Sequence, residues 1–165
     1  MNSYISPKEN IIWGIFLYGV IKNVFNGEEN MNLLNTRIKM ATEISLEQLA
    51  SVLGGNTAGM GARVAYIPEK GLIKKTPAMV KVSHPTYGDL EINLYTLGSN
   101  VQLNTQYYHS DAYMKAKIEA ENARGLFANR KIEKFKELDA KEDIYCDQLN
   151  DALDASFKDL GIEVY

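Results

Sequence analysis

The sequence predicts a single α+β domain in which a small antiparallel sheet of three to four strands packs against an amino-terminal helix and a carboxy-terminal helical hairpin. First, glycine- and proline-rich turns divide residues 62–108 into short segments in which apolar and polar residues alternate, as in strands with one buried face. Second, residues 110–160 are charged and alanine-rich, with apolar residues at helical spacing. Third, 165 residues suit one domain of ordinary size.

Composition excludes several classes of protein. The chain has one cysteine, Cys146, so no intramolecular disulfide framework is possible, and its two histidines leave a structural zinc site short of ligands. The formal net charge of −3 argues against a surface built throughout to neutralise phosphate. The frequent use of Asn, Lys, Ile and Tyr suggests an AT-rich genome, such as that of a virus or a mobile element. We expect no cofactor and no metal, and a location in the cytoplasm, which is the host cytoplasm if the protein is viral.

Residues 1–30 predict an apolar helix and a polar linker that are separable from the domain formed by residues 31–165. Ser6 and Pro7 have the residue types of a helix start. The uncharged run that follows, residues 11–21, is too short to span a bilayer. Peripheral membrane contact through residues 11–24 stays an alternative to contact with a protein. The candidate protein-contact residues on one face of this helix are Trp13, Phe16, Leu17 and Val20.

A short helix is predicted to begin after Ser45. Ser45 and Gln48 have the spacing of a capping box, and Ile44 and Leu49 have the spacing of a hydrophobic staple across it. The two glycines that begin at Gly54 are expected to end the helix, because glycine is a poor helix former.

Two functional alternatives concern this helix and the segment after it. Residues 46–64 partly match a helix-turn-helix, although Gly55 stands where an apolar residue should pack. The segment Gly54–Arg63 would alternatively hold phosphate with its backbone amides, as in a small enzyme acting on a phosphorylated ligand. It lacks the lysine and hydroxyl residue of a P-loop, and a tight connection from helix to strand also explains its glycines.

The alternation in residues 62–108 predicts a meander with one apolar face. The outer face is neutral and rich in amides, which suits contact with a protein, a glycan or single-stranded nucleic acid. Ordinary exposure to solvent also explains this composition. The predicted strands are residues 63–67, 78–83, 88–97 and 100–108, and the outer-face residues are Asn93, Tyr95, Gln102, Asn104 and Gln106.

Charge is distributed unevenly along the chain. Residues 61–83 contain five cations and a single carboxylate, whereas residues 133–165 contain ten carboxylates and four lysines. The basic region, with its neighbouring tyrosines, is a candidate contact for nucleic acid or phosphate. Its cations are Arg63, Lys70, Lys74, Lys75 and Lys81, and the acidic stripe near the carboxyl end is Asp143, Asp147, Asp151 and Asp154.

Residues 110–160 predict the helical hairpin. A helix begins at Ser110 and runs toward Leu138 with a bend or break near Gly125, and a final amphipathic helix begins at Glu142 and ends at Gly161. Small residues in the first helix allow close approach of another helix, so we regard them as candidate protein contacts. They are Ala116, Ala120 and Ala123.

No pattern of catalytic residues accompanies this architecture. Neither His84 nor His109 has a carboxylate or serine nearby at the spacing of a catalytic pair. The predicted function is therefore non-catalytic: the protein binds another protein or copies of itself, as an assembly component or an inhibitor. The alternatives are a nucleic-acid-binding protein that uses residues 63–81 or 46–64, and the small enzyme described above.

Overall fold

The computed structural model describes residues 31–40, 43–98 and 100–163. The chain divides into two compact units, Met1–Asn32 and Leu33–Tyr165, and the account below concerns the second unit. The predicted amino-terminal helix lies outside the described residues, and so do its four candidate contacts, which are Trp13, Phe16, Leu17 and Val20.

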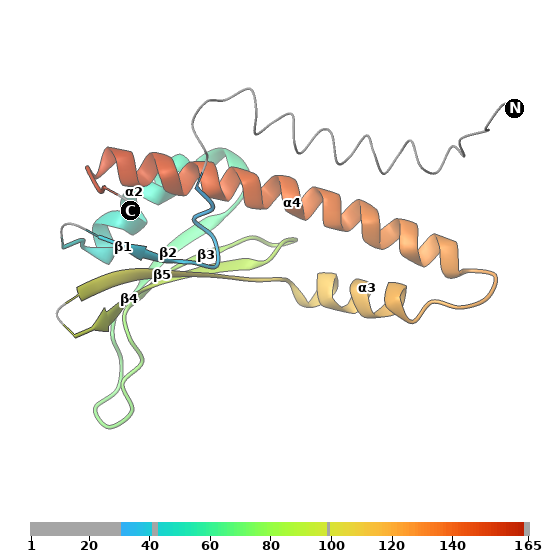
Figure 1. Ribbon diagram of the computed structural model, residues 1–165, viewed down its shortest axis with the longest axis horizontal. Coiled ribbons are helices and arrows are strands. Elements are labelled where there is room, and N and C mark those ends of the chain that lie inside the picture. Colours follow the sequence, from blue (N-terminus) through green and yellow to red (C-terminus); the bar gives the residue numbers. More distant parts are fainter. Residues whose placement is uncertain (1–30, 41–42, 99, 164–165) are drawn as a thin grey trace, which may run out of the picture. The chain divides into compact units, whose positions relative to one another are not determined.

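The second unit contains a five-stranded sheet in which every neighbouring pair is antiparallel (Figure 1). The strands are β1 (Arg37–Lys39), β2 (Arg63–Ile67), β3 (Met79–Ser83), β4 (Asp89–Leu97) and β5 (Asn100–Tyr108), in the order β1-β5-β4-β3-β2. The predicted meander is confirmed, and each of its strands begins within one residue of the predicted position. β1 was not predicted, because a three-residue strand is too short to show a period.

Three α-helices and one 3₁₀ turn complete the described unit. They are α2 (Leu46–Asn56), η1 (Ala58–Met60), α3 (Asp111–Glu121) and α4 (Ala128–Asp159). The predicted hairpin is confirmed, with α3 and α4 joined at the predicted break near Gly125, whose φ is +79°. The second predicted boundary is wrong: α4 runs for 32 residues through positions 138–142, where no glycine or proline interrupts it.

The start of α2 is as predicted, and its end is later than predicted. The Ser45 hydroxyl accepts a hydrogen bond from the backbone N–H of Gln48 at 3.4 Å, which is the bond of an N-cap. The helix continues through both glycines to Asn56, because the hydroxyl of Thr57 donates to the carbonyl of Leu53 at 2.8 Å and closes the last turn.

The core lies between one face of the sheet and a layer formed by α2 and the second half of α4 (Figure 1). α3 packs against the first half of α4 and lies beyond the sheet. The helical hairpin therefore covers the apolar face with one helix rather than with two. The fully buried side chains of this core include Leu49, Leu53, Val80, Leu90, Ile92, Leu103, Leu149 and Leu153.

The other face of the sheet is not covered by any described element, and we call it the open face. Residues 68–78 connect β2 to β3 and extend beyond the sheet on the side away from α4 (Figure 1); we call this segment the arm. No helix among the described residues combines the length and the apolar character that crossing a membrane requires.

Candidate functional site

The arm has a defined shape at its tip. Lys70 and Thr76 exchange two backbone hydrogen bonds, of 3.1 and 2.7 Å, across the arm. Gly71 has a φ of +99°, and a Cβ at this position would overlap the carbonyl oxygen of Lys74. The turn therefore requires glycine at position 71 and is closed by two backbone hydrogen bonds.

Two adjacent apolar side chains occupy this tip. Leu72 is 99% exposed and Ile73 is 102% exposed, so neither packs against another described residue. Of the lysines beside them, Lys75 forms an ion pair with Glu69 at 3.1 Å. The tip therefore combines an apolar end with positive charge, the other two lysines being Lys70 and Lys74.

A second exposed apolar pair lies in the turn between α3 and α4, where Leu126 is 92% exposed and Phe127 is 66% exposed. The three alanines that were candidate protein contacts lie close to this turn. Ala120 is buried in the packing of α3 and α4, while Ala116 and Ala123 are half-buried. Much of this small-residue stripe is therefore used within the chain.

The structure does not bring the five predicted basic residues together. Three lie in the arm, and Arg63 lies at the end of β2 that is farther from the arm. Lys81 lies on the open face, with its ammonium 2.9 Å from Asp89 and 3.5 Å from Glu91. The hydrogen bond to Asp89 raises the pKa of Lys81 above its ordinary value, so its charge is retained and neutralised locally.

The structure of residues 46–64 contradicts the helix-turn-helix alternative and gives partners to two of the amides in the segment Gly54–Arg63. Residues 58–67 form η1 and β2, so the second helix that a helix-turn-helix requires is not present in 46–64. The backbone N–H groups of Thr57 and Met60 already donate to carbonyls of the same segment, at 2.9 Å each. These amides are therefore not directed at a phosphate, and the glycines serve the connection from helix to strand.

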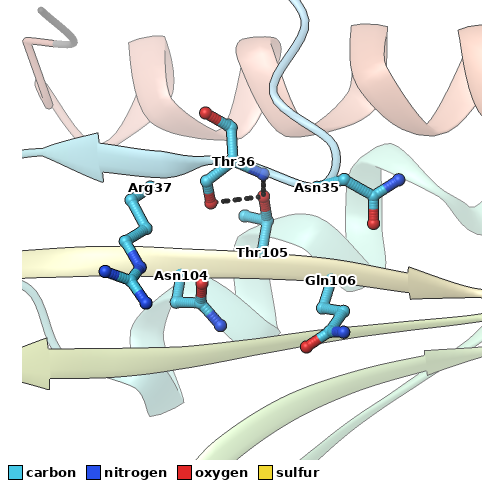
Figure 2. Close-up of a pocket in the computed structure, with 6 residues that line it drawn as sticks. All are labelled: Asn35, Thr36, Arg37, Asn104, Thr105 and Gln106. Carbon is cyan, nitrogen blue, oxygen red and sulfur yellow. Dashed lines mark hydrogen bonds between the residues drawn. The ribbon is translucent and has the colours of Figure 1, made fainter.

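The open face carries a polar pocket of about 400 Å³ at the β1 edge (Figure 2). On the α4 side of β5 the Thr105 hydroxyl accepts from the backbone N–H of Thr36 at 3.2 Å, and the Thr105 N–H donates to the Thr36 carbonyl, so this residue ties residue 36 to β5. The guanidinium carbon of Arg37 lies 4.5 Å from the ring centroid of Tyr95. The lining residues are Asn35, Thr36, Arg37, Asn104, Thr105 and Gln106.

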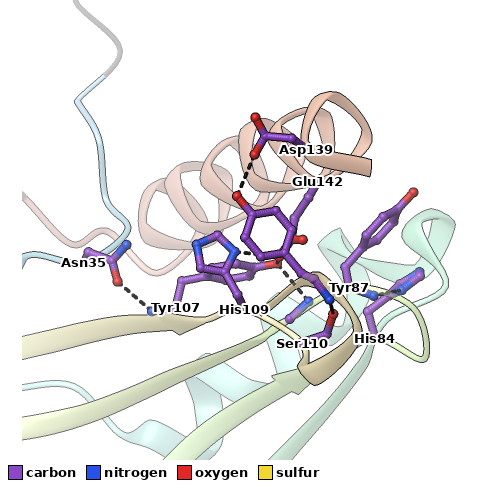
Figure 3. Close-up of polar contacts among 10 residues, drawn as sticks. Asn35, His84, Tyr87, Tyr107, His109, Ser110, Asp139 and Glu142 are labelled. Carbon is purple, nitrogen blue, oxygen red and sulfur yellow. Dashed lines mark hydrogen bonds and ion pairs between the residues drawn. The ribbon is translucent and has the colours of Figure 1, made fainter. Parts of the chain in front are cut away.

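A buried carboxylate joins the sheet to α4 (Figure 3). Glu142 is 2% exposed, and its Oε1 accepts a hydrogen bond of 2.7 Å from the Tyr107 hydroxyl and lies 3.0 Å from Nδ1 of His109. The same hydroxyl accepts from the backbone N–H of Gly88 at 2.9 Å. Burial and the bond to Glu142 raise the pKa of Tyr107, which keeps it a donor. Oε2 of Glu142 has no hydrogen-bond partner among the described residues.

The histidine of this cluster is held by structural contacts. The rings of His109 and Tyr113 stack with centroids 4.2 Å apart, and the Tyr113 hydroxyl donates to Asp139 at 2.6 Å. A histidine hydrogen-bonded to a carboxylate supplies two of the three members of a hydrolytic triad, but the nearest serine in sequence, Ser110, accepts from the Tyr113 N–H as the N-cap of α3. This arrangement anchors the α3–α4 hairpin to β5.

The sequence contains one signal for this cluster that the prediction did not include. Glu142 occupies an inward position of the apolar face of α4, in phase with Tyr145 and Leu149. A carboxylate at such a position needs a buried donor. The sequence does not identify the donors to Glu142, because Tyr107 is 35 residues away in the chain and His109 is 33 residues away.

The rate at which the Cys146 thiol is alkylated tests whether this thiol is buried in the folded protein. Burial raises its pKa to about 11, so the thiolate is scarce at neutral pH. We expect slow alkylation of the folded protein by iodoacetamide at pH 8, with a rate that increases up to about pH 11. Because the folded pKa lies above the ordinary thiol value, ionisation also lowers the stability of the fold as pH increases through this range. Mass spectrometry of timed samples measures the rate, and the denatured protein is the control; equal rates would contradict the burial.

Comparison with known proteins does not assign this chain to a family: no family model matches it, and neither a curated protein nor a solved structure matches it. No group of three or more metal-ligating side chains occurs among the described residues. Function is therefore inferred from the arm, the open face and the charges around them.

Proposed function

We propose that this protein is a non-catalytic assembly protein that binds a second copy of itself through the tip of the arm. The observation that carries the proposal is the near-complete exposure of Leu72 and Ile73 on a turn that two backbone hydrogen bonds close. Burying each side chain in a partner would contribute about 1.5–3 kcal/mol. A structured tip also loses little conformational entropy on binding.

Charge indicates where the tip binds. The arm has three lysines, and α4 presents Ile144, which is 60% exposed, beside a stripe of carboxylates. Burial raises the pKa of Asp143 in this stripe, and repulsion from Asp139 and Asp147 raises it further. Lysines of a second copy would reduce this repulsion while its tip covers Ile144.

Such contacts join two different surfaces, the arm of one copy and α4 of the next. A contact of this kind is heterologous, so every copy still has one surface of each type to offer. The assembly therefore grows into open chains, or closes into a ring if the rotation between copies permits it.

Sedimentation velocity over a wide range of protein concentration tests the proposal. We expect the mass of the wild-type protein to increase with concentration, while the double variant L72S/I73S stays near the monomer mass of 18.5 kDa. Losing the apolar contact of both side chains should weaken association by about 100-fold or more. The matched control is L126S/F127S, which changes the other exposed apolar pair and should still associate.

A charge exchange identifies the second surface. K70E/K74E should associate weakly with itself, and mixing it with D143K/D151K should restore association, because opposite charges again face each other. A wild-type protein of constant monomer mass at every concentration would overturn the proposal. Tip-dependent binding to vesicles of anionic phospholipid, with no self-association, would instead assign the tip to a membrane surface.

A further inference from the structure

We infer that the open face of the sheet binds single-stranded nucleic acid along a path from β1 to the arm. The path, which we call the strip, is one row of residues placed side by side by the strand register. It crosses four spacings between strands, a distance of about 19 Å. Its members are Arg37, Asn104, Asn93, Met79 and Ile67, one from each of β1, β5, β4, β3 and β2.

Positive charge lies at both ends of the strip. Arg37 and Lys39 are exposed on β1, and neither forms an ion pair with a described residue. The other end of the row, Ile67, is followed directly by the arm, with Lys70 and Lys74. A chain that carries a phosphate on every nucleotide would contact cations at both ends of this path.

Local pairing with Lys81 offsets part of the negative charge that the open face carries. The open-face carboxylates of β4, Asp89 and Glu91, are both within salt-bridge distance of Lys81. Lys81 pairs with Glu91 in the register, and this pair lies one row away from the strip. The strip itself contains two amides, two apolar side chains and one guanidinium. It is therefore uncharged between its two cationic ends.

The side chains beside the strip are suited to unpaired bases. Asparagine and glutamine amides each donate and accept, as the hydrogen-bonding edges of bases do. Gln102 and Gln106 flank Asn104 on β5, and the guanidinium of Arg37 lies over the ring of Tyr95, which is 39% exposed. Planar arginine and tyrosine groups are the surfaces on which unpaired bases stack. The pocket in Figure 2 adjoins Arg37 and offers space for a base or a phosphate.

This surface favours single strands over a duplex. Amides within a sheet can reach base edges only when the bases are unpaired and turned toward the strands. A duplex presents mainly phosphates to a surface that inserts no helix or ribbon into a groove. The amide row would therefore not contact the bases of a double helix. An uncharged glycan would not form ion pairs with the cations at the two ends.

Fluorescence anisotropy with labelled oligonucleotides tests the inference, using single-stranded DNA, single-stranded RNA and duplex DNA of mixed sequence. We expect both single strands to bind and the duplex to bind more weakly. With four cations in contact, the logarithm of the affinity should fall with the logarithm of salt concentration with a slope of about −3. The difference between DNA and RNA then shows whether the 2′-hydroxyl is recognised.

Variants locate the site. R37A/K39A should weaken binding by about tenfold or more and reduce the salt slope by about half. R37K keeps the charge but loses the planar group, so it should retain the slope and lose affinity. The matched control is K134A/K136A, which removes two exposed lysines from the part of α4 that lies beyond the sheet. This control should bind as the wild-type protein does.

Three results would overturn the inference: no binding of single strands at low salt, unchanged affinity in R37A/K39A, or a duplex that binds as tightly as the single strands. All substituted side chains are exposed, so thermal unfolding should confirm that the variants remain folded. L72S/I73S should bind nucleic acid normally even if it no longer self-associates. The two proposals can therefore fail independently.

Discussion

Replacing Gly88 by alanine is expected to destabilise the fold by about 3 kcal/mol or more. A Cβ at position 88 would overlap the carbonyl oxygen of Tyr108 and lie 2.8 Å from the hydroxyl of Tyr107. The Tyr108 carbonyl belongs to the backbone at the end of β5. The Tyr107 hydroxyl is hydrogen-bonded to both the Gly88 N–H and Glu142. The added methyl group would therefore separate the end of the sheet from the cluster that anchors α4.

Urea unfolding monitored by circular dichroism measures the effect of G88A. The matched control is G55A, because a Cβ at Gly55 meets no atom within 4 Å and the residue lies inside α2. Alanine there should stabilise the protein by up to about 1 kcal/mol. If G88A were as stable as the wild-type protein, the close packing of Gly88 on β5 would be refuted.

Replacing Glu142 by alanine is expected to cost about 3 kcal/mol. The change removes the acceptor of the buried Tyr107 hydroxyl and leaves a cavity between β5 and α4. Glutamine at this position keeps an oxygen for that hydroxyl and fills the same volume, although its NH₂ group would occupy the place of Oε2, which has no described partner. E142Q should therefore lie between the wild-type protein and E142A in stability.

The same unfolding measurement on H109A and on the double variant E142A/H109A separates the contributions of Glu142 and His109 to the free energy of unfolding. His109 is 44% exposed, so water can replace part of its contact with Glu142. We expect H109A to cost less than E142A, and the double variant to cost less than the sum of the two. Equal stability of E142A and the wild-type protein would show that the buried carboxylate does not anchor α4.

Local patterns predicted most of the sheet and the start of α2. The alternation of Leu90 and Ile92 with Glu91 and Asn93 requires one face to be buried, and this condition defines a strand without knowledge of its partners. The capping spacing at Ser45 likewise involves one turn of chain. The uninterrupted α4 was missed because an acidic pair at positions 142–143 has the composition of a helix start, although Glu142 is a buried anchor.

The surfaces on which the two proposals rest were predicted only in part. The amide residues of the outer face were identified, because alternation places them opposite the apolar side chains. The lysines of the arm were identified as a basic region, but the exposure of Leu72 and Ile73 was not, since an apolar pair in a sequence is usually buried. The contribution of Arg37 was missed together with β1, the strand that carries it.

The sequence by itself determined the fold class, four of the five strands and the helical hairpin, because each depends on residues within one turn, strand or helix of one another. Only the tertiary structure decided which side chains meet across the molecule. Arg37 joins the strip through its pairing with Asn104, and Glu142 meets Tyr107 across 35 residues of chain. The free energy of these contacts comes from groups distant in the chain, so no local spacing encodes them.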